Sequence, residues 1–116
     1  MAHYAFIDAS GIVTEVIAGR DENDFVDGIA DWQSYYQEQR EGLTCRRTSY
    51  NTYIDRNEES LTFGKSLHAN GKTPLRGCYA GIGYFYDEVN DVFIPQGWTY
   101  DAVNDVFVAP APADEN

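Results

Sequence analysis

The chain has few cationic residues for its length. Its 116 residues include 8 Lys and Arg against 19 Asp and Glu, which leaves a formal net charge of -11. Such a charge repels phosphate backbones and anionic membrane surfaces. The composition therefore predicts neither a nucleic-acid partner nor a membrane partner. It leaves three reasons for the acidity open: solubility, a basic partner, or a salty medium.

Long apolar runs are also missing. No stretch of the sequence approaches the roughly 18 consecutive apolar residues that a membrane-spanning helix needs. The opening residues, MAHYAFIDAS, contain neither the positively charged segment nor the apolar segment of a secretory signal. We therefore expect a protein that is made in the cytoplasm without such a signal.

Cysteine and histidine are scarce, with two of each. The spacing of Cys45 and Cys78 fits neither a zinc site nor a redox pair, so we expect two reduced packing residues, with a mutual disulfide as the alternative. Histidine is the usual side chain for proton transfer near neutral pH, yet neither His3 nor His68 stands beside a recognisable nucleophile. The sequence therefore predicts a protein that is not an enzyme and holds no metal or cofactor.

Apolar residues make up 43 % of the chain and aromatic residues 15 %, which is typical of a folded domain. The order of the patterns predicts a β-rich α+β fold. It comprises an N-terminal β-hairpin, one helix packed on an antiparallel sheet, a long central loop, two C-terminal β-hairpins and an extended proline arm. We expect residues 1–96 to form the α+β domain, with the loop at 55–76. Residues 97–116 then add the second repeated hairpin and the arm to the same structural unit.

The N-terminal hairpin is predicted from two β-branched and aromatic runs, HYAFID and IVTEVI, joined by the sequence DASG at residues 8–11. An Asp at the start and a Gly in the left-handed position are typical of a hairpin built on a type I turn. This turn pairs Phe6 with Thr14. We expect the face that carries Tyr4 and Phe6 to be the more buried one.

A helix of about four turns is predicted after this hairpin. It begins at an N-cap, Asn23 or Asp24, and ends before Gly42. Its core-facing residues recur at spacings of four, three and four positions, as one face of a helix does: Phe25, Ile29, Trp32 and Tyr36.

The middle of the chain predicts a strand, a loop and a second strand. Residues 43–54 alternate as a strand does, and residues 55–76 are polar and rich in turn formers. Loops of this length in small domains are usually functional, so we expect this one to contact a partner. The stretch CYAGIGYFYD from Cys78 predicts a tyrosine-rich strand. Its glycines indicate bends and not a phosphate-binding loop, because more strand and no helix follows.

Two stretches near the C-terminus repeat each other, YDEVNDVFIP from Tyr86 and YDAVNDVFVAP from Tyr100. Each predicts a hairpin whose turn begins at Asp and ends at Asn, at residues 87–90 and 101–104. These turns pair Tyr86 with Val92 and Tyr100 with Val106. The few oxygen ligands cannot fill a calcium shell, so we interpret the repeat as scaffolding. Isolated hairpins are marginal in water, so both must pack on the domain or on another subunit.

Three stretches, HYAFID..GIVTEVI, TSYN and YAGIGYFYDEVNDVFIPQ, resemble a family of small, uncharacterised structural-type proteins of tailed bacteriophages that infect marine bacteria and cyanobacteria. The resemblance implies a virion protein made in the host cytoplasm. Together with the acidic, hairpin-rich pattern it favours a capsid cement or decoration protein. Such a protein bridges the phage major capsid protein or other virion subunits and is itself a homo-oligomer, a dimer or a trimer. The alternatives are a tail or tail-fibre accessory domain that binds a host surface glycan, and a small enzyme or inhibitor that acts on the host.

The candidate partner-contacting residues are the central arginines, two residues of the polar loop, the aromatic residues of the repeated hairpins and the prolines of the arm. They are Arg46, Arg47, Lys65, His68, Tyr84, Tyr86, Phe93, Trp98, Tyr100, Phe107, Pro110 and Pro112.

Overall fold

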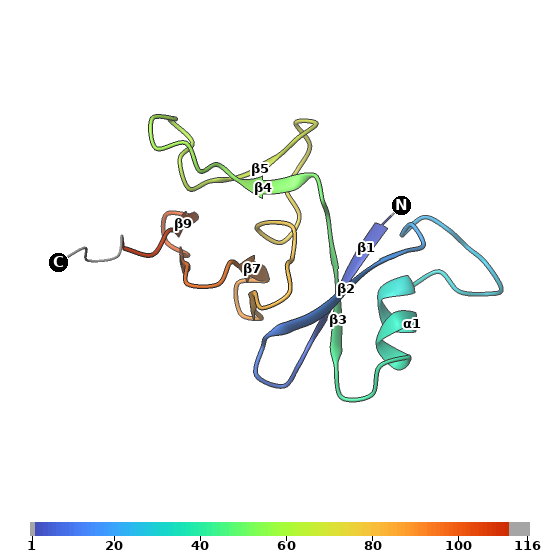
Figure 1. Cartoon of the computed structure of the whole chain (residues 1–116). Helices are drawn as coiled ribbons and strands as arrows, with labels where there is room; N and C mark the ends of the chain where they lie inside the picture. The colour runs from blue at the N-terminus through green and yellow to red at the C-terminus, as the bar shows by residue number, and fades with distance from the viewer. Residues whose placement is uncertain (1, 112–116) are drawn as a thin grey trace.

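The computed structural model describes residues 2–111, which form one helix and nine strands (Figure 1). All strand pairs are antiparallel, and the predicted β-rich α+β class is confirmed. The elements are β1 (Ala2–Ile7), β2 (Val13–Gly19), α1 (Trp32–Glu38), β3 (Thr44–Thr48), β4 (Thr52–Ile54), β5 (Ser66–His68), β6 (Phe85–Asp87), β7 (Val92–Ile94), β8 (Thr99–Asp101) and β9 (Val106–Val108).

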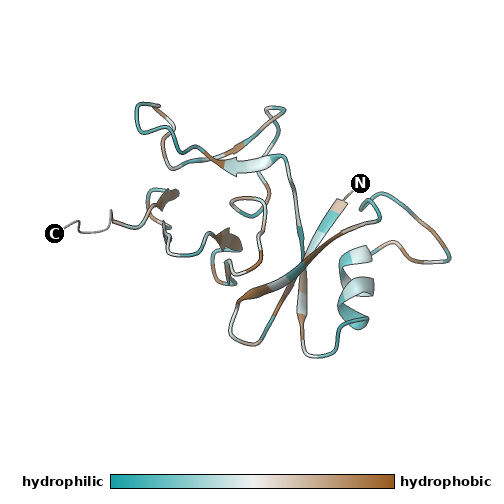
Figure 2. Ribbon diagram, viewed as in Figure 1, coloured by the Kyte–Doolittle hydropathy of each residue, from teal (hydrophilic) through white to brown (hydrophobic). Residues whose placement is uncertain are grey.

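The N-terminal sheet has the order β2-β1-β3, and both of its faces are buried. On one face Tyr4 and Phe6 pack with Trp32 of α1. On the other face Ala5 and Ile7, with their neighbours, pack with the C-terminal hairpins. The expectation that one face of the first hairpin is the more buried is therefore wrong, because the chain covers the sheet from both sides. Figure 2 shows hydrophobic colour on part of β2 and on β7 and β9.

The register of the first hairpin differs from the predicted one by a β-bulge. Ile7 pairs with Val13, but Phe6 pairs with Glu15 and not with Thr14. Thr14 is the extra residue, and its hydroxyl lies 3.4 Å from the Phe6 carbonyl oxygen. The predicted turn itself is present, since Gly11 has a φ of 85° and the Asp8 carboxylate accepts from the backbone of Ser10.

The helix is shorter than predicted. It starts at Trp32, where the Asp31 side chain accepts from the Ser34 backbone N–H, so Asn23 and Asp24 are not its N-caps. Upstream, Asp27 and Gly28 have φ values of 53° and 81°, the pattern of a two-residue reverse turn, and Val26 and Ile29 exchange backbone hydrogen bonds across it. An Asp-Gly pair is a strong signal for such a turn, and it overrides the helical spacing. As a result the Phe25 side chain is 72 % exposed.

The predicted strand at 43–54 is two strands in two sheets. The chain turns between β3 and β4, and β4 pairs with β5, which lies inside the segment that the sequence predicts as a loop. Two buried threonines hold this arrangement. The Thr48 hydroxyl accepts from the Ala80 N–H at 2.9 Å, and the Thr52 hydroxyl accepts from the Leu75 N–H at 3.0 Å. These bonds tie residues 75–80 down as irregular backbone, so the predicted strand from Cys78 forms only at β6.

The two repeated hairpins share one structure, and their turns are one residue longer than predicted. Tyr86 pairs with Phe93 and Tyr100 pairs with Phe107, so the predicted valine pairings are wrong. The left-handed residue is Asp91 or Asp105, with φ values of 55° and 53°, and not the preceding Asn.

The reason for the longer turn lies in the hydrogen bonds of the repeat. Asp87 accepts from the Asn90 side-chain amide at 2.7 Å, and Asp101 accepts from the Asn104 amide at 2.8 Å, which holds both Asn residues within the turn. The next Asp then accepts from the tyrosine hydroxyl, Tyr86 to Asp91 in one copy and Tyr100 to Asp105 in the other. Asp tolerates the left-handed region, so the carboxylate can close the turn.

Arg76 joins three parts of the molecule. Its guanidinium donates to the Arg47 carbonyl oxygen of β3 at 3.1 Å and to the Asp91 carboxylate of the β6–β7 turn at 2.8 Å. Its own carbonyl oxygen accepts from Phe93 of β7 at 2.9 Å. The side chain is only 18 % exposed, and the backbone has a φ of 49°, an unusual value for a residue with a side chain.

We predict that Arg76→Met lowers the free energy of unfolding by about 3 kcal/mol, because hydrogen bonds to charged groups contribute about 1.5 to 3 kcal/mol each. Urea denaturation followed by circular dichroism measures this. Lys72→Met, at an exposed position, is the matched control, and we expect it to change stability by less than about 0.5 kcal/mol. Equal stability of the two variants would contradict the role of Arg76.

Candidate interaction site

Three of the candidate partner-contacting residues are core residues of this chain. Tyr86, Phe93 and Phe107 are buried, and the rings of Tyr86 and Phe93 lie 5.1 Å apart, centroid to centroid. Tyr84, Trp98 and Tyr100 are half-buried against the same core. Within the described residues, most of the area of these rings therefore serves the packing of the hairpins.

The remaining candidates lie at or near the surface. The Arg46 guanidinium stands over the Tyr86 ring at 5.8 Å, and Lys65 donates to the Asn104 carbonyl oxygen at 2.7 Å. His68 lies in β5, where its Nδ1 accepts from the Asn70 N–H. Pro110 is exposed, and Pro112 lies outside the described residues, as does the rest of the predicted arm from 112 onward.

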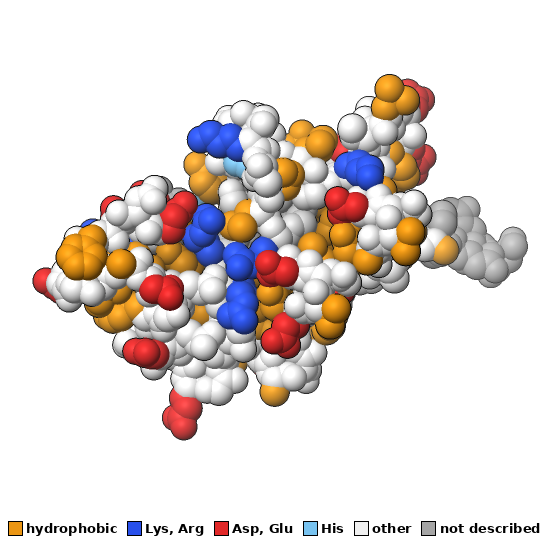
Figure 3. All heavy atoms as spheres, turned by 180° about the vertical axis from the view of Figure 1, so that it is seen from behind, with side chains coloured by type: hydrophobic (Ala, Val, Ile, Leu, Met, Phe, Trp, Pro, Cys, Tyr) orange, Lys and Arg blue, Asp and Glu red, His pale blue; other side chains and the backbone are white. Residues whose placement is uncertain are grey.

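Arg47 stands between two cavities on one face of the molecule. Figure 3 shows Lys and Arg side chains gathered near the middle of the face that is turned away from the viewer in Figure 1, with Asp and Glu side chains around them. The Arg47 guanidinium forms an ion pair with Glu22 at 3.6 Å, and both residues line both cavities. We call the two the Trp32 cavity and the Tyr50 cavity.

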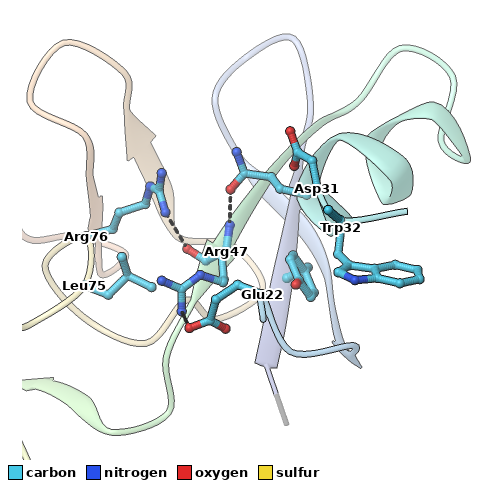
Figure 4. Close-up of a pocket in the computed structure, with 9 residues that line it drawn as sticks. Glu22, Asp31, Trp32, Arg47, Leu75 and Arg76 are labelled. Atoms are coloured by element: carbon cyan, nitrogen blue, oxygen red, sulfur yellow. Dashed lines mark hydrogen bonds and ion pairs between the residues drawn. The ribbon is translucent and has the colours of Figure 1, made fainter. Parts of the chain in front are cut away.

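The Trp32 cavity has a volume of about 320 Å³ and lies between α1, β3 and the segment that carries Arg76. Figure 4 shows Arg47 between Leu75 and Glu22, with Arg76 on the far side. Its polar groups are largely engaged within the chain, since Gln33 accepts from the Arg47 backbone N–H at 2.7 Å. The lining residues are Tyr4, Glu22, Ala30, Asp31, Trp32, Gln33, Arg47, Leu75 and Arg76.

The Tyr50 cavity, also about 320 Å³, is lined almost entirely by polar and charged side chains. It brings together both histidines of the chain, which are far apart in the sequence. The Tyr50 ring is 62 % exposed and lies edge-on to the His3 ring at 5.3 Å. The lining residues are Ala2, His3, Asp21, Glu22, Arg47, Thr48, Ser49, Tyr50, Asn51, His68 and Lys72.

Burial keeps the Tyr4 hydroxyl and the two cysteine thiols in their protonated forms at neutral pH. Burial raises the pKa of Tyr4 to about 12. Burial also raises the pKa of Cys45 to about 12 and that of Cys78 to about 12, so both thiols stay protonated at neutral pH. Both cysteines are free, as the sequence predicts.

The described residues contain no group of three or more His, Cys, Asp or Glu side chains that could hold a metal ion. No helix in the described part of the chain is long and apolar enough to cross a membrane. This face offers hydrogen-bonding groups, charges of both signs and the exposed ring of Tyr50.

A second surface feature is absent from the sequence-based list of candidates. Four turns each carry a large hydrophobic side chain that points into solvent, and we call these residues the turn-tip residues: Leu61, Ile82, Val89 and Val103. The equivalent residues of the repeat, Val89 and Val103, are each 92 % exposed. The sequence places both valines inside predicted turns, and an apolar residue in a turn is the signal that could have identified them.

The comparisons with known proteins give no relative for this chain: no family model matches it, and no curated protein or solved structure is significantly similar to it.

The tyrosine hydroxyl of the second repeat predicts a dependence of stability on alkaline pH. The hydrogen bond to the Asp105 carboxylate, with burial, raises the pKa of Tyr100 from 10.0 to about 12. The folded state therefore holds this proton more tightly, so the stabilisation is complete below pH 10 and is lost as the pH rises toward about 12. We expect the difference in unfolding free energy between the natural chain and Tyr100→Phe to shrink over this range. A difference that is the same below and above pH 10 would show that the hydrogen bond has no such role.

Proposed function

We propose that this chain is a structural protein of a tailed-phage virion, and that it acts as a capsid cement or decoration protein. In this role it binds the major capsid protein or other virion subunits and bridges them, as a dimer or trimer of its own. The phage origin comes from the sequence resemblance. The observation that carries the role is the placement of the turn-tip residues.

The turn-tip residues suit attachment at several points. Single exposed hydrophobic residues are ordinary on protein surfaces, but here they recur at the ends of separate turns, including both copies of the repeat. Fully burying one such aliphatic side chain contributes about 1.5 to 3 kcal/mol. Several weak contacts made by one rigid body reinforce one another, because each further contact forms at a high effective concentration.

The strands also favour a partner. Three two-stranded sheets, β4-β5, β6-β7 and β8-β9, have strands of three residues each, and no further strand is paired to them in the described part of the chain. Several outward backbone groups of these strands are bonded within the chain, since Tyr86 donates to Gly11, Phe93 to Arg76 and Phe107 to Gly64, so only the remaining edge groups can pair with another chain. A shell subunit or a second copy of this chain can cover them.

The alternatives have less support. For an enzyme or an inhibitor that acts catalytically, the described residues offer protonated thiols and no metal-binding cluster. For glycan binding through the hairpin aromatics, Tyr86 and Phe107 are buried, and Tyr100 is engaged with Asp105. Cement activity therefore stands as the proposal.

We expect the triple variant Leu61→Ser, Val89→Ser and Val103→Ser to fold normally and to bind virions at least about tenfold more weakly. Loss of even one buried aliphatic contact raises the dissociation constant by a factor of about ten. The measurement is co-sedimentation of labelled recombinant protein with purified particles that lack it, followed by a capsid thermal-stability assay.

The matched control changes neighbouring exposed residues of the same three turns: Glu59→Ser, Glu88→Ser and Ala102→Ser. This variant should bind as the natural protein does. Equal binding of the two triple variants would show that the turn-tip residues do not contribute to binding of the virion. Binding of the natural protein to tails but not to capsids would replace the cement role with the tail role.

A further inference from the structure

The Tyr50 cavity has the composition of a ligand site that the cement role does not use. Four separate segments form it: the start of β1, residues 21–22, the end of β3 with the turn after it, and the region of β5 up to Lys72. A cavity of about 320 Å³ lies within the size range of small-ligand sites. Its volume is therefore sufficient for a ligand of one or two rings.

The charges that line the cavity are balanced. Arg47 and Lys72 provide two cations, and Asp21 and Glu22 provide two anions. Arg47 and Glu22 already form an ion pair across the wall that this cavity shares with its neighbour. An anionic or cationic ligand would meet as much repulsion as attraction here, whereas an uncharged ligand with many hydroxyl groups can both donate to the carboxylates and accept from the cations.

The aromatic ring of Tyr50 supplies a flat apolar platform beside these polar groups. It is the most exposed ring in the lining, and the His3 ring supports it from one side at 5.3 Å. His3 in turn contacts the Tyr79 ring at 5.6 Å. A ring fixed in this way loses little entropy when a ligand stacks on it.

The position of the His3 side chain lowers the stability of the fold, and packing alone does not explain it. Its Nδ1 atom is buried and has no hydrogen-bond partner among the described residues. A buried polar atom without a partner costs about 1 to 3 kcal/mol. Such costs are concentrated at functional sites, where the position of a side chain serves binding more than stability.

We propose that the Tyr50 cavity binds an uncharged saccharide, which stacks one sugar face on Tyr50 and shares its hydroxyl groups between the carboxylates and the cations of the lining. This inference does not depend on the cement role, since a saccharide site can exist on a protein of any assembly. The site also differs from the hairpin aromatics that the sequence suggests for glycan contact.

The test is titration of the ¹⁵N-labelled full chain, followed by amide chemical shifts, with the methyl glycosides of glucose, galactose, mannose and N-acetylglucosamine. We expect at least one of the four to shift the amides of Tyr50, Asn51 and His68 in a saturable way. Tyr50→Ala should weaken this binding at least about fivefold, because stacking on one ring contributes about 1 kcal/mol. Tyr50→Phe retains the ring and should retain most of the binding.

The control variant is Tyr53→Ala, which removes another exposed tyrosine, on β4 and outside this cavity. It should leave the binding unchanged. Inorganic phosphate serves as the charged probe and should shift the same amides less than the sugar does. No saturable shift with any of the four glycosides, a larger response to phosphate, or equal loss in Tyr50→Ala and Tyr53→Ala would each overturn the proposal. None of these outcomes bears on binding to capsids, so the two proposals fail separately.

Discussion

The hydrogen bonds of Arg76 hold together parts of this chain that no continuous sheet joins. The N-terminal sheet, the β4-β5 pair and the two repeated hairpins are separate sheets, which short backbone contacts such as the bridge between Ile12 and Phe85 also link. Arg76 reaches the β3 backbone with one guanidinium nitrogen and the β6–β7 turn with another, while its backbone carbonyl holds β7. Lysine could not replace it, because a single ammonium group lacks the fork that reaches both acceptors. Arg76 thus links the β6–β7 hairpin to β3, in addition to the backbone bonds that join this hairpin to the turn of the first one.

Much of the fold follows from local sequence rules, and the failures have two causes. The Gly11 turn, the presence of the two repeated hairpins and the free cysteines are as the sequence predicts, but the pairing within both repeated hairpins is shifted by one residue from the predicted one. The helix is overestimated because Asp27-Gly28 forms a reverse turn that interrupts a helical hydrophobic pattern. The strand at 43–54 breaks because Thr48 and Thr52 bond to backbone that lies far along the chain, a contact that no local pattern contains. Local signals therefore placed most turns correctly, while a competing local turn shortened the helix and tertiary hydrogen bonds divided the strand.

The candidate surfaces were harder to predict than the fold. The aromatic residues of the repeat suggest contact with a partner. However, three of them, Tyr86, Phe93 and Phe107, are buried in the core of this chain. The aliphatic residues between them, Val89 and Val103, are the ones that face solvent. Likewise His3 and His68 stand apart in the sequence, and only the fold brings them to one cavity beside Tyr50. An exposed surface is a property of the packed chain, so residue type alone does not identify it.

The central claim is that this chain is a repeated structural component of a phage capsid. The most direct test is the number of copies of the chain in each purified virion, measured by quantitative mass spectrometry against isotope-labelled standard peptides. The account predicts copies on the order of the number of capsid subunits or of their symmetry axes. A few copies per particle, confined to the tail, or complete absence from the virion would contradict it.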